Sequence, residues 1–89
     1  MEQATTPLLA AASALSDLAA GREPWRGNVI SGALVLQTLM TRGELDRDLQ
    51  DAALGLEALA TGRPLRLDQA GRARASALAT KVRNLAAGN

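Results

Sequence analysis

The sequence predicts an all-α fold. Nineteen of its 89 residues are Ala and sixteen are Leu, whereas it contains only three Val, one Ile, one Trp and neither Phe nor Tyr. Ala and Leu are among the best helix-forming residues, and the β-branched and aromatic residues that favour strands are almost absent. Because a chain of this length usually forms one domain, we expect a single helical domain over residues 1–89.

Start and stop signals divide the chain into a small helical bundle. Residues that commonly cap a helix N-terminus precede three apolar segments: Thr6, Asn28 and Asp68. Glycines that can end a helix follow three segments: Gly21, Gly43 and Gly62. An acidic run starts the third segment, and Pro24 with Gly27 indicates a non-helical linker over residues 22–27. The predicted helices, about four in number, cover residues 7–20, 28–42, 44–61 and 68–87.

The second predicted helix carries apolar side chains on nearly every side. Such a helix is normally buried, so we expect it at the centre of the molecule or of a dimer. The core should be weak, because Ala contributes one methyl group and the chain has no Cys or His for a disulfide or a zinc site. Either the helices pack closely through Ala or a second subunit completes the core, and we favour the second subunit. The candidate self-association residues are Ile30, Leu34, Leu36, Leu39 and Met40.

Apolar spacing also predicts the inward faces of the last two helices. In the third helix the apolar residues lie alternately four and three apart, a spacing typical of knobs-into-holes packing: Leu45, Leu49, Ala52, Leu56 and Leu59. Leu54 lies on the opposite face, either as a lone exposed leucine or as part of a contact surface. In the fourth helix the apolar stripe is Ala75, Leu78, Val82 and Leu85.

The residue types missing from the chain argue against catalysis. Without His, Cys or Tyr, the sequence lacks the commonest general base, the thiol nucleophile and the phenolic acid. Imidazole and thiolate metal sites are excluded for the same reason. Asp48 and Asp51 share a helix face, but their spacing lacks the glycine and the closing Glu of a calcium loop. We therefore expect no enzyme activity, no metal site and no cofactor.

Charge is distributed unevenly along the chain. Residues 43–61 carry a net charge of −4 and residues 62–89 a net charge of +5. The basic residues of this last third are candidate nucleic-acid ligands: Arg63, Arg66, Arg72, Arg74, Lys81 and Arg83. The alternative is that they face the acidic third helix. Helical geometry favours this alternative, because the charges flank the apolar stripe on both sides instead of gathering on one face.

Trp25 is the only aromatic residue and lies in the predicted linker. One interpretation, which we favour, is that the indole plugs the end of the core. The other is that it anchors a partner protein, with the flanking Arg22 and Arg26 reaching carboxylates of that partner, since Trp and Arg are frequent hot-spot residues. Leu54 joins these three as a candidate partner-binding residue.

Together these patterns predict a non-catalytic protein–protein interaction module: a small adaptor, inhibitor or chaperone-like subunit that forms a homodimer. The alternative is a nucleic-acid-binding regulator that uses the basic C-terminal third. The sequence shows no apolar stretch long enough for a membrane span and no basic signal-peptide start, so we expect no membrane partner and a cytoplasmic location. Nine Arg against one Lys is typical of a GC-rich bacterial genome.

Overall fold

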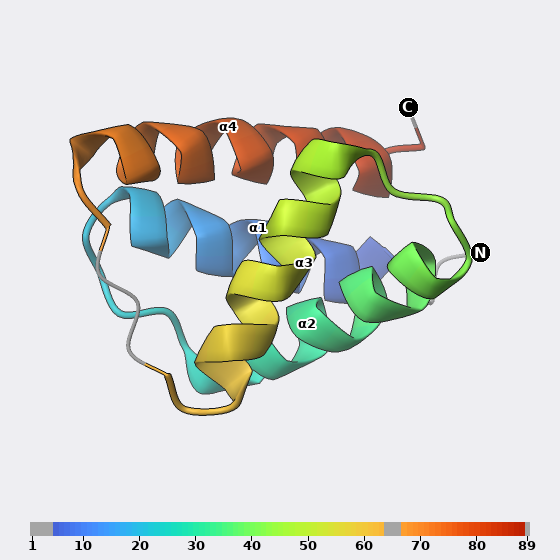
Figure 1. Cartoon of the computed structure of the whole chain (residues 1–89), viewed down its shortest axis with the longest axis horizontal. Coiled ribbons are helices and arrows are strands. Elements are labelled where there is room, and N and C mark those ends of the chain that lie inside the picture. The colour runs from blue at the N-terminus through green and yellow to red at the C-terminus, as the bar shows by residue number, and fades with distance from the viewer. Residues whose placement is uncertain (1–4, 64–66, 89) are drawn as a thin grey trace.

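Four helices form the structure, as the sequence predicts. The computed structural model describes residues 5–63 and 67–88, and no strand occurs among them. The helices are α1 (Thr5–Ala19), α2 (Arg26–Thr41), α3 (Arg47–Ala60) and α4 (Gln69–Ala86). Figure 1 shows α1 and α4 side by side and antiparallel, α2 next to α1, and α3 crossing in front of them. The all-α prediction is therefore confirmed.

Several of the predicted helix boundaries are also confirmed. Asp68 caps α4, because its Oδ1 accepts the backbone N–H of Gly71 at 2.7 Å. The glycines placed after the first three helices all have the positive φ that a side chain would disfavour: Gly21, Gly43 and Gly62.

The starts of α1 and α3 differ from the prediction. Helix α1 already includes Thr5, so Thr6 is not its N-cap. Helix α3 begins at residue 47 instead of residue 44, because the Asp46 side chain accepts the backbone N–H of Leu49 at 2.9 Å. The acidic run does lie at the start of α3, as predicted, but the capping residue is its second carboxylate, Asp46.

Helix α2 begins at Arg26, earlier than predicted. The Trp25 carbonyl accepts the backbone N–H groups of Asn28 at 3.0 Å and Val29 at 3.1 Å, so the first turn starts there. Asn28 lies inside this turn and is not the cap, and Trp25 occupies the cap position without a side-chain hydrogen bond. The predicted linker is therefore too long, since Gly27 is helical.

The centre of the bundle is α1 and not α2. Helix α1 packs against α4 and α2 and also touches α3. It contributes six buried residues to the core: Leu8, Ala11, Ala12, Ala14, Leu15 and Leu18. Helix α2 buries only one face: Val29, Gly32, Ala33 and Leu36. The expectation that the apolar second helix lies at the centre of the molecule is wrong, because part of its apolar surface points away from the core. Its expected place at the centre of a dimer stays a prediction.

Small residues allow α1 and α2 to approach closely. A Cβ atom on Gly32 would lie 2.6 Å from the Ala11 Cα atom, so a side chain at this position would collide with the α1 backbone. Alanines are also buried in α3 and α4: Ala52, Ala53, Ala75 and Ala79. No polar or charged side chain is buried in residues 5–63 and 67–88. Close packing through small side chains, the alternative that we did not favour, thus forms this core within one subunit.

The predicted inward faces of α3 and α4 are confirmed. Leu56 and Val82 are fully buried, and Leu59 and Leu85 are half-buried against the core. Leu54 lies on the outer face of α3 and is 53 % exposed. The helical phase read from the sequence is therefore correct for both helices.

Candidate interaction surfaces

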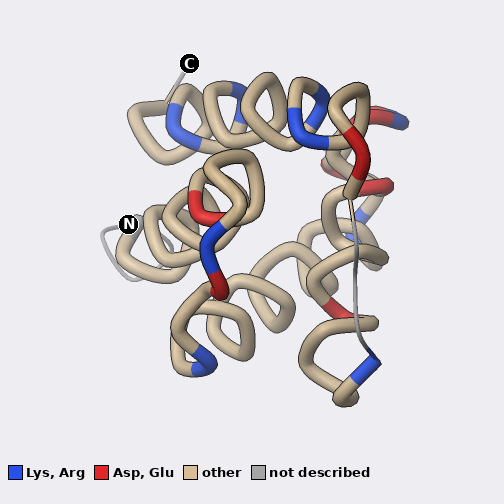
Figure 2. Tube along the Cα trace, turned by 90° about the vertical axis from the view of Figure 1, so that its left-hand side faces the viewer, with Lys and Arg blue, Asp and Glu red and all other residues tan. Residues whose placement is uncertain are grey.

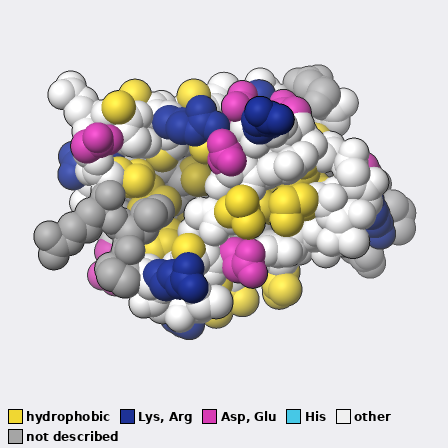
Figure 3. Space-filling model, in the orientation of Figure 1, with side chains coloured by type: hydrophobic (Ala, Val, Ile, Leu, Met, Phe, Trp, Pro, Cys, Tyr) yellow, Lys and Arg dark blue, Asp and Glu magenta, His cyan; other side chains and the backbone are white. Residues whose placement is uncertain are grey.

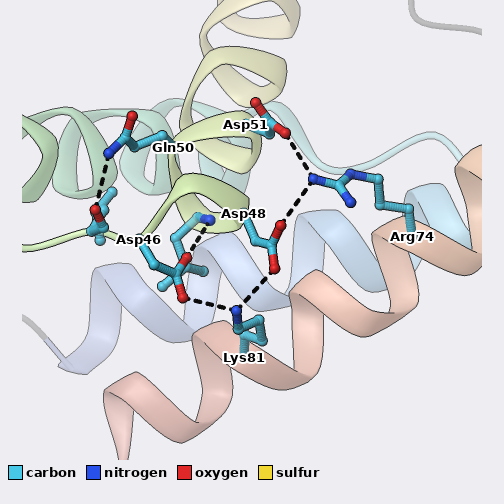
Figure 4. Close-up of polar contacts among 8 residues, drawn as sticks. Asp46, Asp48, Gln50, Asp51, Arg74 and Lys81 are labelled. Carbon is cyan, nitrogen blue, oxygen red and sulfur yellow. Dashed lines mark hydrogen bonds and ion pairs between the residues drawn. The ribbon is translucent and has the colours of Figure 1, made fainter.

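The acidic start of α3 faces basic side chains of α4 (Figure 4). Lys81 Nζ lies 2.8 Å from Asp46 Oδ2 and 3.1 Å from Asp48 Oδ2. Arg74 Nη2 lies 2.7 Å from Asp51 Oδ2 and 3.3 Å from Asp48 Oδ1. For Arg74 and Lys81, the favoured interpretation that the basic tail faces the acidic helix is confirmed.

These contacts shift the pKa values of both the acidic and the basic side chains. The hydrogen bond from Lys81, then that from the Leu49 N–H, lowers the pKa of Asp46 below its ordinary value. Lys81 and, to a smaller extent, Arg74 lower the pKa of Asp48. In return, Asp46 and then Asp48 raise the pKa of Lys81. The paired side chains are between 39 % and 53 % exposed, so water and salt screen them and they form a solvated structural contact.

The described residues contain no cluster of three or more acidic side chains placed to hold a metal ion. Asp48 and Asp51, the carboxylates that share a face of α3, both accept hydrogen bonds from Arg74. The Arg74 guanidinium thus occupies the face of α3 that these two carboxylates share.

The other basic candidates of the C-terminal third lie elsewhere. Arg83 donates a hydrogen bond to a serine hydroxyl of α1. The Arg72 guanidinium lies over the turn after α1, where a Cβ atom on Gly21 would be 3.1 Å from its Nη1. Arg63 follows the end of α3, and Arg66 lies outside the described residues. The five described candidates therefore lie on different parts of the structure and do not gather on one face.

The two candidate arginines beside the indole bind groups of their own chain. Arg22 Nε and Nη2 both donate to Asp17 Oδ1 at 3.1 Å. Arg26 Nη2 donates to the Ala60 carbonyl oxygen at 3.0 Å. Arg26 thus connects the start of α2 to the end of α3, where a cation also interacts favourably with the helix dipole.

The Trp25 side chain is 71 % exposed, so the interpretation that it plugs the core is wrong. Its six-membered ring lies over the first turn of α2, where a Cβ atom on Gly27 would be 2.7 Å from the ring atom Cη2. Gly27 therefore leaves the space that the indole occupies on the helix surface. The sequence pattern indicates a helix-breaking role for Gly27, and this second role depends on where the ring lies in three dimensions.

Three large apolar side chains follow the outer face of α2. Ile30 is 40 % exposed and Leu34 is 65 % exposed. Gly27, Ile30 and Leu34 are three and four residues apart, so they lie on one side of the helix, and the Trp25 ring covers Gly27. We call Trp25, Ile30 and Leu34 the α2 stripe.

The candidate self-association residues divide between the two faces of α2. Ile30 and Leu34 belong to the α2 stripe. Leu36 is fully buried within the subunit. The prediction that it contacts a second copy is therefore wrong, because its side chain has no exposed surface. Leu39 and Met40 are half-buried and pack against the core. The sequence could not separate these residues, because it does not show which direction faces α1.

A cleft of about 650 Å³ lies at the end of the molecule where α1 and α3 end. Leu18, Leu59 and Leu67 line it with apolar surface. Among the described residues, four arginines from three chain segments also line it: Arg22, Arg26, Arg63 and Arg72. Figure 3 shows apolar atoms exposed on the left half of the molecule, and Figure 2 looks onto the end that holds the cleft and shows basic positions on several different segments. We call the cleft lined by these leucines and arginines the arginine cleft.

The arginine cleft combines residues that the sequence analysis assigned to two hypotheses. Arg22 and Arg26 were candidates for a protein partner, and Arg63 and Arg72 were candidates for nucleic acid. The sequence does show that each of these four arginines lies at or near a helix end. It does not show that packing brings these helix ends to the same side of the molecule.

No family model matches the chain, and no curated protein or solved structure matches it either. Within the described residues, no helix has the length and hydropathy needed to cross a bilayer. The function must therefore be inferred from the surfaces themselves.

Proposed function

We propose that this chain is a non-catalytic protein–protein interaction module that binds a partner protein through the α2 stripe. The observation that carries the proposal is the exposure of Trp25, Ile30 and Leu34 on one side of a single helix. Exposed apolar surface costs free energy in water, roughly 25 cal/mol per Å², and contiguous apolar patches are typical of interaction sites. Trp is also among the residues most enriched at interface hot spots.

The surroundings of the α2 stripe favour an apolar protein surface as the occupant. Arg26 is the only charged residue of α2, and its guanidinium already donates to the Ala60 carbonyl. The other exposed residues of α2 are uncharged hydroxyl residues: Ser31, Thr38 and Thr41. The Thr38 and Thr41 hydroxyls donate to carbonyls of the preceding helical turn. A neutral stripe of this kind suits packing against an apolar helix face of another protein.

A second copy of the chain is the first partner to test. Stripe-on-stripe packing about a two-fold axis would cover the same residues on both subunits. A homodimer, together with the cytoplasmic and bacterial setting expected from the sequence, belongs to this proposal. Sedimentation over a concentration series separates self-association from binding to a different protein.

The proposal is tested by Leu34→Ser, with Leu9→Ser as the matched control. Both leucines are exposed on a helix, but Leu9 lies on α1 and outside the α2 stripe. We expect Leu34→Ser to abolish self-association or capture of the partner protein from source cells, while its helicity and melting temperature stay those of the parent chain. Leu9→Ser should retain binding. If both variants bind like the parent chain, the α2 stripe is not the interaction surface.

Leu54→Ser shows whether the surface extends to α3. Loss of binding in this variant would add the outer face of α3 to the interface. Unchanged binding would confine the interface to α2.

A further inference from the structure

We infer that the arginine cleft binds an acidic segment of a partner protein, with carboxylates on the guanidinium groups and an apolar side chain among the leucines. The inference rests on the proposed function, because it assumes a protein partner. It concerns a different surface, however, so the two can fail separately.

Charge favours an acidic occupant. Of the lining residues that the structure describes, four are arginines and only Glu23 is acidic. Arg22 and Arg26 already bind Asp17 and the Ala60 carbonyl. Arg63 and Arg72, by contrast, form no ion pair or side-chain hydrogen bond with the described residues. Two guanidinium groups are thus available to a carboxylate ligand.

The Arg72 guanidinium lies against the turn that follows α1. Gly21 has a φ of 77° and no side chain, and a Cβ atom there would lie 3.1 Å from the guanidinium carbon of Arg72. The flat guanidinium therefore rests close to the turn at the wall of the cleft. A guanidinium at the wall of the cleft can present its paired N–H groups to a carboxylate.

The α3–α4 contact shows one way in which carboxylates bind an arginine of this chain. Arg74 binds Asp48 and Asp51, two carboxylates three residues apart on one helix, at 3.3 Å and 2.7 Å. A leucine, Leu49, lies between them in sequence and is buried in the core. An acidic segment with an apolar residue between its carboxylates would offer the arginine cleft the same combination.

The shape of the cleft also favours a peptide over a nucleic acid. Its volume of about 650 Å³ lies in the range of sites that enclose a small ligand or a few side chains. Leu18, Leu59 and Leu67 give it an apolar lining, and none of its described lining residues is an aromatic that could stack on a base. Phosphate backbones are normally bound along an extended basic track, which a leucine-lined hollow does not provide.

The test uses a peptide that repeats the sequence of residues 48–51, Asp-Leu-Gln-Asp, twice, with both ends blocked. The control peptide carries Asn at each Asp position. Each is titrated into the ¹⁵N-labelled full chain while backbone resonances are followed, and a duplex DNA oligonucleotide forms the third arm. We expect the Asp peptide, and not the Asn peptide or the DNA, to shift the N–H resonances of Gly21 and Gly62, which line the cleft.

Variants locate the binding. The double variant Arg63→Gln and Arg72→Gln should bind the Asp peptide about ten-fold more weakly, since it loses two charge-assisted contacts. Arg47→Gln is the matched control, because Arg47 is exposed at the start of α3 and outside the cleft. Its binding should equal that of the parent chain.

The inference is overturned if neither cleft glycine shifts, if the Asn peptide binds as well as the Asp peptide, or if DNA alone shifts these resonances. Leu34→Ser should leave the peptide titration unchanged. Failed peptide binding together with partner capture that still depends on Leu34 therefore removes this inference and keeps the proposed function. If the peptide binds at the cleft and Leu34→Ser has no effect on capture, the proposed function is removed and this inference is kept.

Discussion

The two faces of α2 carry similar residues but differ in their surroundings. On the inner face, Gly32 lies against the α1 backbone and Leu36 is fully buried. On the outer face, Ile30 and Leu34 are exposed next to Trp25. Apolar residues on all sides of a helix therefore do not establish that the helix is completely buried. Only the position of neighbouring helices separates core residues from residues that another protein can contact.

The largest expected effect on stability comes from replacing a leucine by alanine on the inner face of α2, compared with the same replacement on its outer face. Leu36→Ala removes a fully buried side chain and should lower the free energy of unfolding by about 2–5 kcal/mol. Leu34→Ala removes a side chain that is 65 % exposed and should change it by less than about 1 kcal/mol. Chemical denaturation of both variants measures the difference. Equal losses would mean that the inner and outer faces are wrongly assigned.

A second pair tests the close approach of α1 and α2. Gly32→Ala places a Cβ atom 2.6 Å from the Ala11 Cα, so the helices must separate, at a cost of about 1–3 kcal/mol. Gly55→Ala in α3 is the control, because nothing lies within 4 Å of the added atom. There the better helix propensity of Ala should stabilise the fold by up to about 1 kcal/mol. Thermal unfolding that shows the same sign for both variants would contradict this packing.

The exposed end of the α2 stripe should matter little for stability. Trp25→Ala should change the free energy of unfolding by less than about 1 kcal/mol, because the indole is 71 % exposed. In the parent chain, the indole should emit near the wavelength of free tryptophan in water and be quenched readily by iodide. A blue-shifted emission protected from iodide, with a large loss of stability in Trp25→Ala, would place the indole in the core after all.

The smallest effect concerns the charged contact between α3 and α4. The pKa values of Asp46 and Asp48 are lowered in the folded chain, mainly by Lys81. Their stabilisation is therefore complete above the ordinary aspartate pKa of about 3.9 and is lost as the pH falls through that value toward the folded pKa.

Melting temperatures measured across this acidic range should fall less in Asp48→Asn than in the parent chain. Added salt should reduce the difference, because the paired side chains are about half exposed. An identical acid dependence in both proteins would show that Asp48 does not contribute to it.

The sequence predicted the fold where local chemistry decides it. The Asp68 cap, the glycine stops and the inward faces of α3 and α4 depend on residues within one or two helical turns, and the structure confirms them. The central position of α1 and the burial of Leu36 depend on contacts between helices, so the sequence could not supply them. Trp25 was misassigned for a related reason, since its exposure depends on a ring lying over Gly27 in three dimensions.

The candidate sites follow the same division. The pairing of the acidic and basic segments could be predicted from helical geometry, because the charges flank an apolar stripe that must face the core. The arginine cleft could not, because its lining comes from three chain segments whose meeting depends on the packing of all four helices.

The most direct measurement of the central claim is site-specific photo-crosslinking in the source cell. A photoreactive side chain replaces Leu34 in the α2 stripe, and in a second variant it replaces Ala77, an exposed residue of α4. Our account predicts a covalent adduct of discrete mass from position 34, to a second copy or to another protein, and none from position 77. No adduct from position 34, or the same adducts from both positions, would contradict the claim that the α2 stripe binds a protein.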